Sequence, residues 1–166
     1  MYDTIYHISD IHVRLKERHD EYREVFSELY KKLNRKKKNC LIVITGDILH
    51  SKTELTPECI ELTTDFFINL SKMMPVIVIA GNHDANLAND NSMDALSPMV
   101  KNLGDNFHYL KDSGIYNFDN LSFAVISVFD EIFPDIKKHP DNCIKIALHH
   151  GTLDGAVTDV GFKLKH

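Results

Sequence analysis

Apolar runs that alternate with helical patterns constrain the fold of this chain more than any other feature. Residues 4–9, 41–45 and 76–80 are rich in β-branched side chains and predict strands, the last two buried on both faces. Between them, residues 19–36 show helical spacing, and residues 56–72 open with a threonine cap and a proline. This order of strands and helices predicts a parallel sheet with crossover helices.

The apolar side chains of both predicted helices are expected to face the sheet, because each set recurs every three to four residues. In the first helix the set is Tyr22, Val25, Phe26, Leu29, Tyr30 and Leu33. In the second helix the set is Ile60, Phe66, Phe67 and Leu70. Each helix should therefore pack on the sheet through one face.

The second half of the chain has a different pattern. Residues 84–98 are polar and predict a long functional loop, and a short helix is expected over 94–103. Four strand candidates follow, at residues 107–110, 115–118, 122–127 and 144–149. We expect these strands to form an antiparallel second sheet, which gives an α/β (α+β) sandwich of two sheets with helices outside.

Composition limits the class of protein. The 166 residues are enough for a sizeable core, and we expect a single domain over residues 1–166. The net charge of −5 gives no overall attraction to nucleic acid or to anionic membranes. Three separated cysteines indicate reduced thiols rather than a disulfide framework. Because we find no signal peptide and no apolar run of bilayer length, we expect an intracellular protein, cytoplasmic or nuclear.

One run of positive charge, residues 35–38, follows the first predicted helix. It could form a patch for nucleic acid, or it could complement the dipole at the C-terminus of that helix on a solvated face. We favour the second interpretation.

Polar side chains follow the three strands of the predicted sheet at the point where each strand ends. These are Asp10 and His12 after the first strand, Asp47 after the second, and Asn82 and His83 after the third. The carboxyl ends of parallel strands share one edge of a sheet, and ligands bind there. Three segments that are far apart in the sequence should therefore converge in space.

The types of these side chains predict metal ions. Carboxylate, imidazole and amide oxygen, with no thiolate, suit Mn²⁺, Fe²⁺ or Zn²⁺ better than Ca²⁺. A carboxylate can bridge two ions about 3.5–4 Å apart, which is the geometry of two-metal hydrolases. Any single aspartate here could instead serve a turn or a helix cap. The ordered set, each member after a strand, favours a two-metal phosphoesterase centre.

The ordered set resembles the calcineurin-like metallophosphoesterase superfamily, over residues 8–151. Within it, the chain most resembles the nuclease subunit of DNA double-strand-break repair complexes, the SbcD/Mre-eleven type. Gly-Asp-Ile-Leu-His, residues 46–50, ends in a histidine as in those exonucleases, and Leu-His-His-Gly, residues 148–151, is similar to the fourth motif of the family. The resemblance implies a four-layer α-β-β-α sandwich, which would be incomplete at the C-terminus of this chain.

The resemblance also implies a ligand set for two divalent ions, with Mn²⁺ expected and Fe²⁺ or Zn²⁺ possible. Asp10 and His12 would bind the first ion, Asp47 would bridge both, and Asn82 and His149 would bind the second. His150 is the alternative to His149, which is preferred because it directly follows the apolar strand.

Three further residues receive roles from the resemblance. His83 would protonate the leaving oxygen or stabilise the transition state, and His50 would contact the scissile phosphate or stabilise its charge. Asp84 would orient a histidine or the loop.

The fifth motif of the family, a Gly-His-x-His pair, has no counterpart after Gly151. Each ion is then left with three protein ligands, which would weaken its binding. We therefore expect this chain to be an N-terminal fragment of a longer nuclease. Whether these residues alone turn over substrate is open at this point.

The implied function is that of a Mn-dependent DNA exonuclease or endonuclease of the DNA-repair type, with DNA as substrate. The implied partners of the full-length protein are a coiled-coil repair ATPase of the SbcC type and a second copy of the chain, with no membrane partner. Two alternatives stay open. One is a nucleotide or small-molecule phosphoesterase on the same scaffold. The other is a non-catalytic remnant or binding module that holds metal weakly.

Overall fold

A computed structural model describes residues 1–33, 38–87, 89, 92–152, 155–158 and 160–163. The predicted end of the first helix at residue 36 and most of the basic run over residues 35–38 lie outside the described residues.

The first sheet has four parallel strands. They are β1 (Thr4–Ile8), β2 (Cys40–Thr45), β3 (Val76–Ile79) and β4 (Phe107–Tyr109), in the spatial order β1-β2-β3-β4. The helices that connect them are α1 (His19–Leu33), α2 (Pro57–Met73) and the single turn α3 (Ser97–Val100). The predicted parallel sheet with crossover helices is confirmed.

The strand β4 corrects one expectation, because residues 107–110 were expected in the second sheet. Instead β4 pairs with β3 in the first sheet, with Val76 opposite Phe107. The short helix α3 lies between the two strands in the sequence, so they form a further strand–helix–strand unit. A connection of this kind places its second strand parallel to its first.

The helices begin where the sequence predicts and pack mostly as expected. The Thr56 hydroxyl accepts a hydrogen bond from the Cys59 backbone nitrogen at 3.3 Å and caps α2. Phe26, Phe66 and most other members of the two apolar sets lie in the core between helices and sheet. Val25 and Ile60 were wrongly placed in these sets, because they remain 63% and 39% exposed.

The second sheet has three strands, and it is not fully antiparallel as the sequence predicts. These strands are β5 (Gly114–Phe118), β6 (Leu121–Ile126) and β7 (Ile144–His149), in that spatial order. β5 and β6 form an antiparallel hairpin, but β7 runs parallel to β6. The segment between β6 and β7 includes the 3-10 turn η1 (Ile136–Lys138) and is long enough to return the chain to the starting end of β6.

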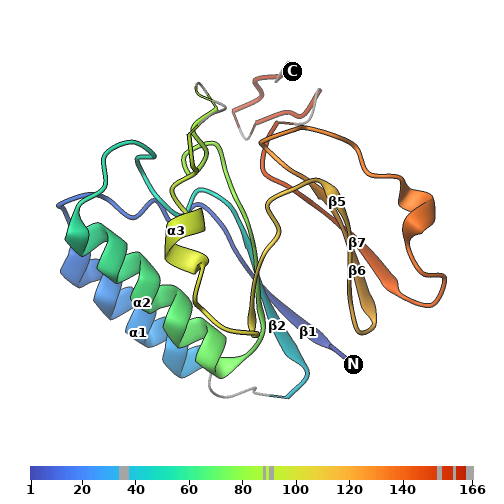
Figure 1. Cartoon of the computed structure of the whole chain (residues 1–166), viewed down its shortest axis with the longest axis horizontal. Coiled ribbons are helices and arrows are strands. Elements are labelled where there is room, and N and C mark those ends of the chain that lie inside the picture. Colours follow the sequence, from blue (N-terminus) through green and yellow to red (C-terminus); the bar gives the residue numbers. More distant parts are fainter. Residues whose placement is uncertain (34–37, 88, 90–91, 153–154, 159, 164–166) are drawn as a thin grey trace.

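The two sheets and the helices form three layers, as Figure 1 shows. Ile42 and Ile44 of β2 lie in the core against the helices, whereas Leu41 and Val43 lie in the core against the second sheet. The α/β class is confirmed. Within the described residues no α-helix follows α3, so three of the four expected layers are seen. In the same residues no helix is long and apolar enough to cross a membrane.

Candidate metal centre

The loops after β1 and β2 continue side by side beyond the ends of their strands. The backbone nitrogens of Asp10 and His12 donate to the carbonyl oxygens of Gly46 and Asp47, at 3.1 and 2.9 Å. One step further, Val13 and Leu49 form an isolated parallel bridge. This pairing fixes the first predicted cluster against the second.

Three of the predicted ligands have an unusual backbone conformation. Asp10, His12 and Asp47 have φ angles of +55°, +50° and +51°, in the left-handed region that non-glycine residues rarely occupy. Such strain costs on the order of 1–3 kcal/mol at each residue and persists where the surrounding structure imposes it, commonly at functional sites. Three of the seven non-glycine residues with a positive φ in the described part of the chain are therefore predicted metal ligands; the other four are Arg18, Asn39, Asp119 and Glu131.

A buried carboxylate joins the second loop to the third. The side chain of Asp84 accepts hydrogen bonds from the backbone nitrogens of Ile48, Leu49 and Gly81, at 3.3, 2.9 and 2.9 Å. Burial raises the pKa of Asp84 to about 6, although these three N–H groups favour its charged form. Asp84 therefore holds two ligand-bearing loops in one arrangement, as the sequence predicts for it.

Two glycines allow these loops to approach more closely than any side chain would permit. A Cβ atom on Gly81 would lie 2.2 Å from Oδ1 of Asp47, and one on Gly46 would lie 2.6 Å from the Gly81 nitrogen. Gly46 also has a φ of +91°, where glycine is favoured. The close contact presses the Asp47 carboxylate against the third loop.

We predict that Gly81→Ala weakens divalent-metal binding at least about 10-fold, because the added methyl group displaces the Asp47 carboxylate. Isothermal titration with Mn²⁺ measures the loss. Gly104→Ala is the control, since Gly104 has a φ of +80° but no atom within 4 Å of a built Cβ. That control should lose some thermal stability and keep its metal affinity. Equal metal affinity in the two variants would contradict the prediction.

One group of possible metal ligands consists of Asp10, Asp47 and His150, whose ligand atoms lie within 4.8 Å of one another. Nε2 of His150 lies 3.4 Å from Oδ1 of Asp47, and Nε2 of His12 lies 3.5 Å from Oδ2 of the same carboxylate. Asp47 is 5% exposed and stands between the two imidazoles. Its position is that of a carboxylate that can bridge two ions.

A second group consists of His12, His50 and His83, which also meet the distance limit of 4.8 Å. The His12 and His83 rings meet edge to face with centroids 4.8 Å apart. Nδ1 of His83 lies 2.8 Å from the His50 carbonyl oxygen, which can only accept, so Nδ1 carries a proton and Nε2 is left for another partner. The His83 backbone nitrogen donates to Oδ1 of Asp47 at 2.9 Å, which ties this group to the first.

The residues present fit divalent metal ions. Nε2 of His12 lies 3.5 Å from Oδ2 of Asp47 and 3.8 Å from Oδ1 of Asp10, so an imidazole nitrogen and two carboxylate oxygens converge. The donor set of carboxylates and imidazoles suits Mn²⁺, Fe²⁺ or Zn²⁺.

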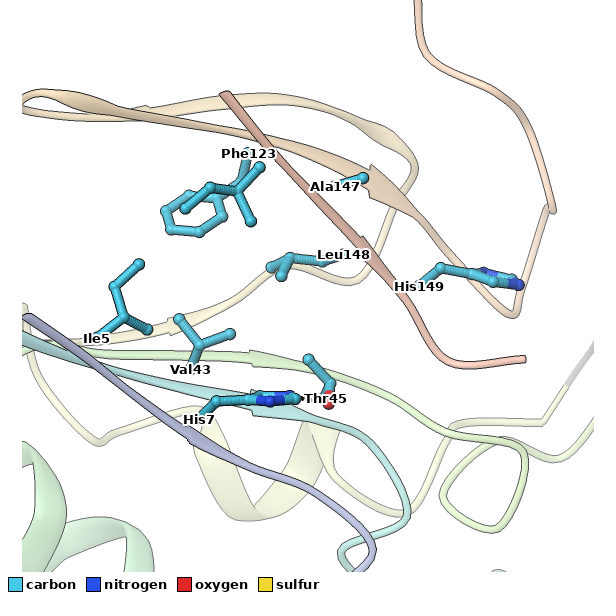
Figure 2. Close-up of a pocket in the computed structure, with 9 residues that line it drawn as sticks. Ile5, His7, Val43, Thr45, Phe123, Ala147, Leu148 and His149 are labelled. Carbon is cyan, nitrogen blue, oxygen red and sulfur yellow. Dashed lines mark hydrogen bonds between the residues drawn. The ribbon is translucent and has the colours of Figure 1, made fainter. Parts of the chain in front are cut away.

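His150, the alternative in the sequence, lies among the ligands, whereas His149 lies apart from both groups. Nδ1 of His150 donates to the Thr45 carbonyl oxygen at 2.7 Å, which leaves Nε2 for a metal. His149 instead donates toward the Ile126 carbonyl and lines a hollow of about 310 Å³ between the two sheets, opposite Thr45 (Figure 2). The structure thus favours His150 over His149.

We predict that His150→Ala weakens Mn²⁺ binding at least about 10-fold, since it removes an imidazole held by a backbone carbonyl beside Asp47. His149→Ala, one residue away on the same strand end, is the matched control and should change metal affinity less than about 2-fold. Isothermal titration compares the two. A larger loss of Mn²⁺ affinity in the His149 variant would contradict the prediction and support His149, the ligand preferred from the sequence.

The remaining predicted site residues lie on the same rim. Asn82 is exposed and lines a hollow of about 200 Å³ together with His50 and His83. Lys52 borders the same hollow, and the sequence pattern did not single it out. The one sequence feature that could have drawn attention to Lys52 is its position two residues after His50.

Comparisons with known proteins identify a family for this chain. A sequence model of the calcineurin-like phosphoesterase family matches residues 3–164. The chain is 47% identical over 175 residues to "Uncharacterized protein R555" of Acanthamoeba polyphaga mimivirus, and the match covers 98% of this chain and 13% of that protein. The crystal structure of Pseudomonas putida nuclease MPE is similar with a TM-score of 0.47 and 17% identity, over 97% of this chain and 67% of that one.

Proposed function

Because the chain belongs to the calcineurin-like phosphoesterase family, we propose that it hydrolyses phosphodiester bonds with two divalent metal ions, and that its substrate is DNA. The observation that carries the proposal is the position of Asp47. This nearly buried carboxylate belongs to one group of possible ligands, in which it lies 3.4 Å from His150 Nε2, and it also lies 3.5 Å from Nε2 of His12 in the other group. The match to R555 spans only 13% of that protein, so the proposal concerns the activity of this domain.

The proposal assigns one ligand set to each ion, based on the family resemblance and on the contacts of Asp47. Asp10, His12 and Asp47 would hold the first ion, and Asp47, Asn82 and His150 would hold the second. Mn²⁺ is the ion proposed, with Fe²⁺ or Zn²⁺ compatible with the same ligands. Two such ions supply an activated water molecule and neutralise the charge that develops on the phosphate oxygens.

The protein's own residues position the substrate and move the proton. His83 is fixed by its Nδ1 bond to the His50 carbonyl and by its backbone bond to Asp47, so its doubly protonated ring would give the Nε2 proton to the leaving oxygen and keep the Nδ1 proton. His50 is exposed, and its ring stacks near that of His83 with centroids 5.8 Å apart. From there His50 can contact the scissile phosphate and stabilise its charge.

The proposal is tested with Mn²⁺ and a panel of substrates: single-stranded and duplex DNA, bis(p-nitrophenyl) phosphate, nucleotides and phosphomonoesters. We expect Mn-stimulated hydrolysis of DNA and of the synthetic diester, and loss of turnover with retained metal binding in His83→Ala. His108→Ala, on β4 and against Phe118, is the control histidine. A preference for nucleotides or monoesters would contradict the assignment of DNA as substrate. Turnover that does not need metal, or no turnover at all, would contradict the proposal that this domain is a metal-dependent phosphodiesterase.

A further inference from the structure

A hollow lies beside the second group of possible ligands, His12, His50 and His83, which we call the three-histidine group, and its lining suits an anion. Its volume is about 200 Å³, and six residues line it: His50, Ser51, Lys52, Thr53, Asn82 and His83. They offer an ammonium group, two hydroxyl groups, an amide and imidazole nitrogens, with no carboxylate among them. A phosphate group, which needs several hydrogen-bond donors and a positive charge, suits this lining.

Lys52 is held at the hollow without a carboxylate partner. Its Nζ donates to the carbonyl oxygen of Asn82 at 3.3 Å, and within the described residues no carboxylate lies within ion-pair distance of it. Arg14, Arg18, Arg23, Lys31 and Lys111 do pair with an acidic side chain, whereas other lysines of the described residues, such as Lys72 and Lys101, have no acidic partner either. The contact with a neutral carbonyl leaves the charge of Lys52 available to an anion.

The hollow also adjoins the groups that would act on the scissile phosphate. His50 and His83 belong both to its lining and to the three-histidine group, and Asn82 is a proposed metal ligand. Ser51, Lys52 and Thr53 line the same hollow and belong to neither group of possible metal ligands, which leaves them for a phosphate beside the reacting one.

We infer that Lys52, with the Ser51 and Thr53 hydroxyl groups, binds the phosphate next to the scissile one in a polynucleotide chain. This inference rests on the proposed function and names the feature of the substrate that the site recognises. It predicts that the site favours substrates with consecutive phosphodiesters over those with a single phosphate. Lys52 would supply binding energy to every nucleotide sequence alike, because phosphate contacts carry no sequence information.

The test uses fluorescence anisotropy with fluorescein-labelled decathymidylate, without added metal, between about 50 and 200 mM salt. Lys52→Ala should lose about 10-fold in affinity, and Lys52→Arg should recover most of it. The slope of log affinity against log salt should become shallower by about 0.7, the value for one phosphate contact on a single strand. The control is Lys72→Ala, at the exposed end of α2 and at the opposite end of the sheet, which should bind as the wild type does.

A kinetic comparison separates this inference from the proposed function. With Mn²⁺, Lys52→Ala should raise KM for decathymidylate about 10-fold more than KM for bis(p-nitrophenyl) phosphate, which has no neighbouring phosphate. Equal oligonucleotide affinity in Lys52→Ala and Lys72→Ala would overturn the subsite even if the wild type hydrolyses diesters. Loss of affinity in Lys52→Ala without any diester hydrolysis by the wild type would support the subsite and overturn the proposed function. The subsite would also be overturned if inorganic phosphate displaced decathymidylate at the same total concentration of phosphate groups.

Discussion

Replacing Asp47 with asparagine should remove nearly all Mn-dependent diester hydrolysis and leave the fold intact. The Asp47 carboxylate lies 3.5 Å from His12 Nε2 and 3.4 Å from His150 Nε2, so it is the one group shared by both proposed ions. A loss of about 1,000-fold is expected, which corresponds to about 4 kcal/mol of lost transition-state stabilisation. The rate on bis(p-nitrophenyl) phosphate and the Mn²⁺ affinity measure the two effects.

The metal-free stability of the Asp47→Asn variant separates a functional role from a structural one. The introduced amide would keep an oxygen for the bond from the His83 backbone nitrogen, now at 2.9 Å, while the substitution removes a nearly buried charge. The melting temperature without metal should therefore be equal to or above that of the wild type. Asp105→Asn, on an exposed loop before β4, is the matched control and should keep full activity. An active Asp47→Asn enzyme would contradict the bridging role.

Replacing Asp94 with alanine should cause the largest loss of stability. Its side chain is fully buried and accepts hydrogen bonds from Lys111 Nζ at 2.8 Å, from the Tyr109 hydroxyl at 3.1 Å, and from Ser97. The variant leaves the Tyr109 hydroxyl and the Lys111 ammonium without that partner, at a cost of about 3–5 kcal/mol. Urea unfolding without metal measures the change.

The same residue gives a pH dependence with a definite sign. Burial alone would raise the pKa of Asp94, but hydrogen bonds from Lys111 and Ser97 outweigh it and lower the pKa below its ordinary value. A carboxyl with a lowered folded-state pKa stabilises the fold above its unfolded pKa of about 3.9, and that stability is lost as pH falls through the folded-state value. The difference between wild type and Asp94→Ala should therefore be constant above about pH 5 and shrink below about pH 4.

Asp141→Ala provides the control for Asp94→Ala, because Asp141 is exposed and its loss should change stability by no more than about 0.5 kcal/mol. A loss below about 1 kcal/mol in Asp94→Ala would show that the buried carboxylate is not a structural centre of the loop before α3. The loop reaches the candidate metal centre through the bond from the Ala95 nitrogen to the Asp84 carbonyl. Reduced metal affinity in Asp94→Ala is therefore expected as a smaller, secondary effect.

Much of the fold could be predicted because local patterns determine it. The parallel order of β1, β2 and β3 follows from the strand–helix alternation, and it brings Asp10, Asp47 and His83 to one rim. The positions of β4 and β7 could not be predicted in this way. A strand's neighbour depends on long-range pairing, and two short strand patterns can belong to either sheet.

The candidate site, like the fold, could be predicted only in part. The convergence of the strand-end clusters was predictable, although the roles of the individual side chains stay predictions. The choice between His149 and His150 was not predictable, since both follow the same apolar strand. It depends on the Thr45 carbonyl, which lies 105 residues earlier and holds His150 beside Asp47. The position of Lys52 at the site was likewise not predictable, because it depends on a contact with Asn82, 30 residues away.

The central claim is that this rim holds two divalent ions that share Asp47. Titration of the metal-free chain with Mn²⁺, followed by electron paramagnetic resonance, tests it most directly. Two ions about 3.5–4 Å apart are expected to couple magnetically, so at two bound equivalents the signal of isolated Mn²⁺ should be suppressed relative to the same amount of free Mn²⁺. The Asp47→Asn variant should lose this suppression. Binding of a single ion per chain, or of two ions without coupling, would contradict the account.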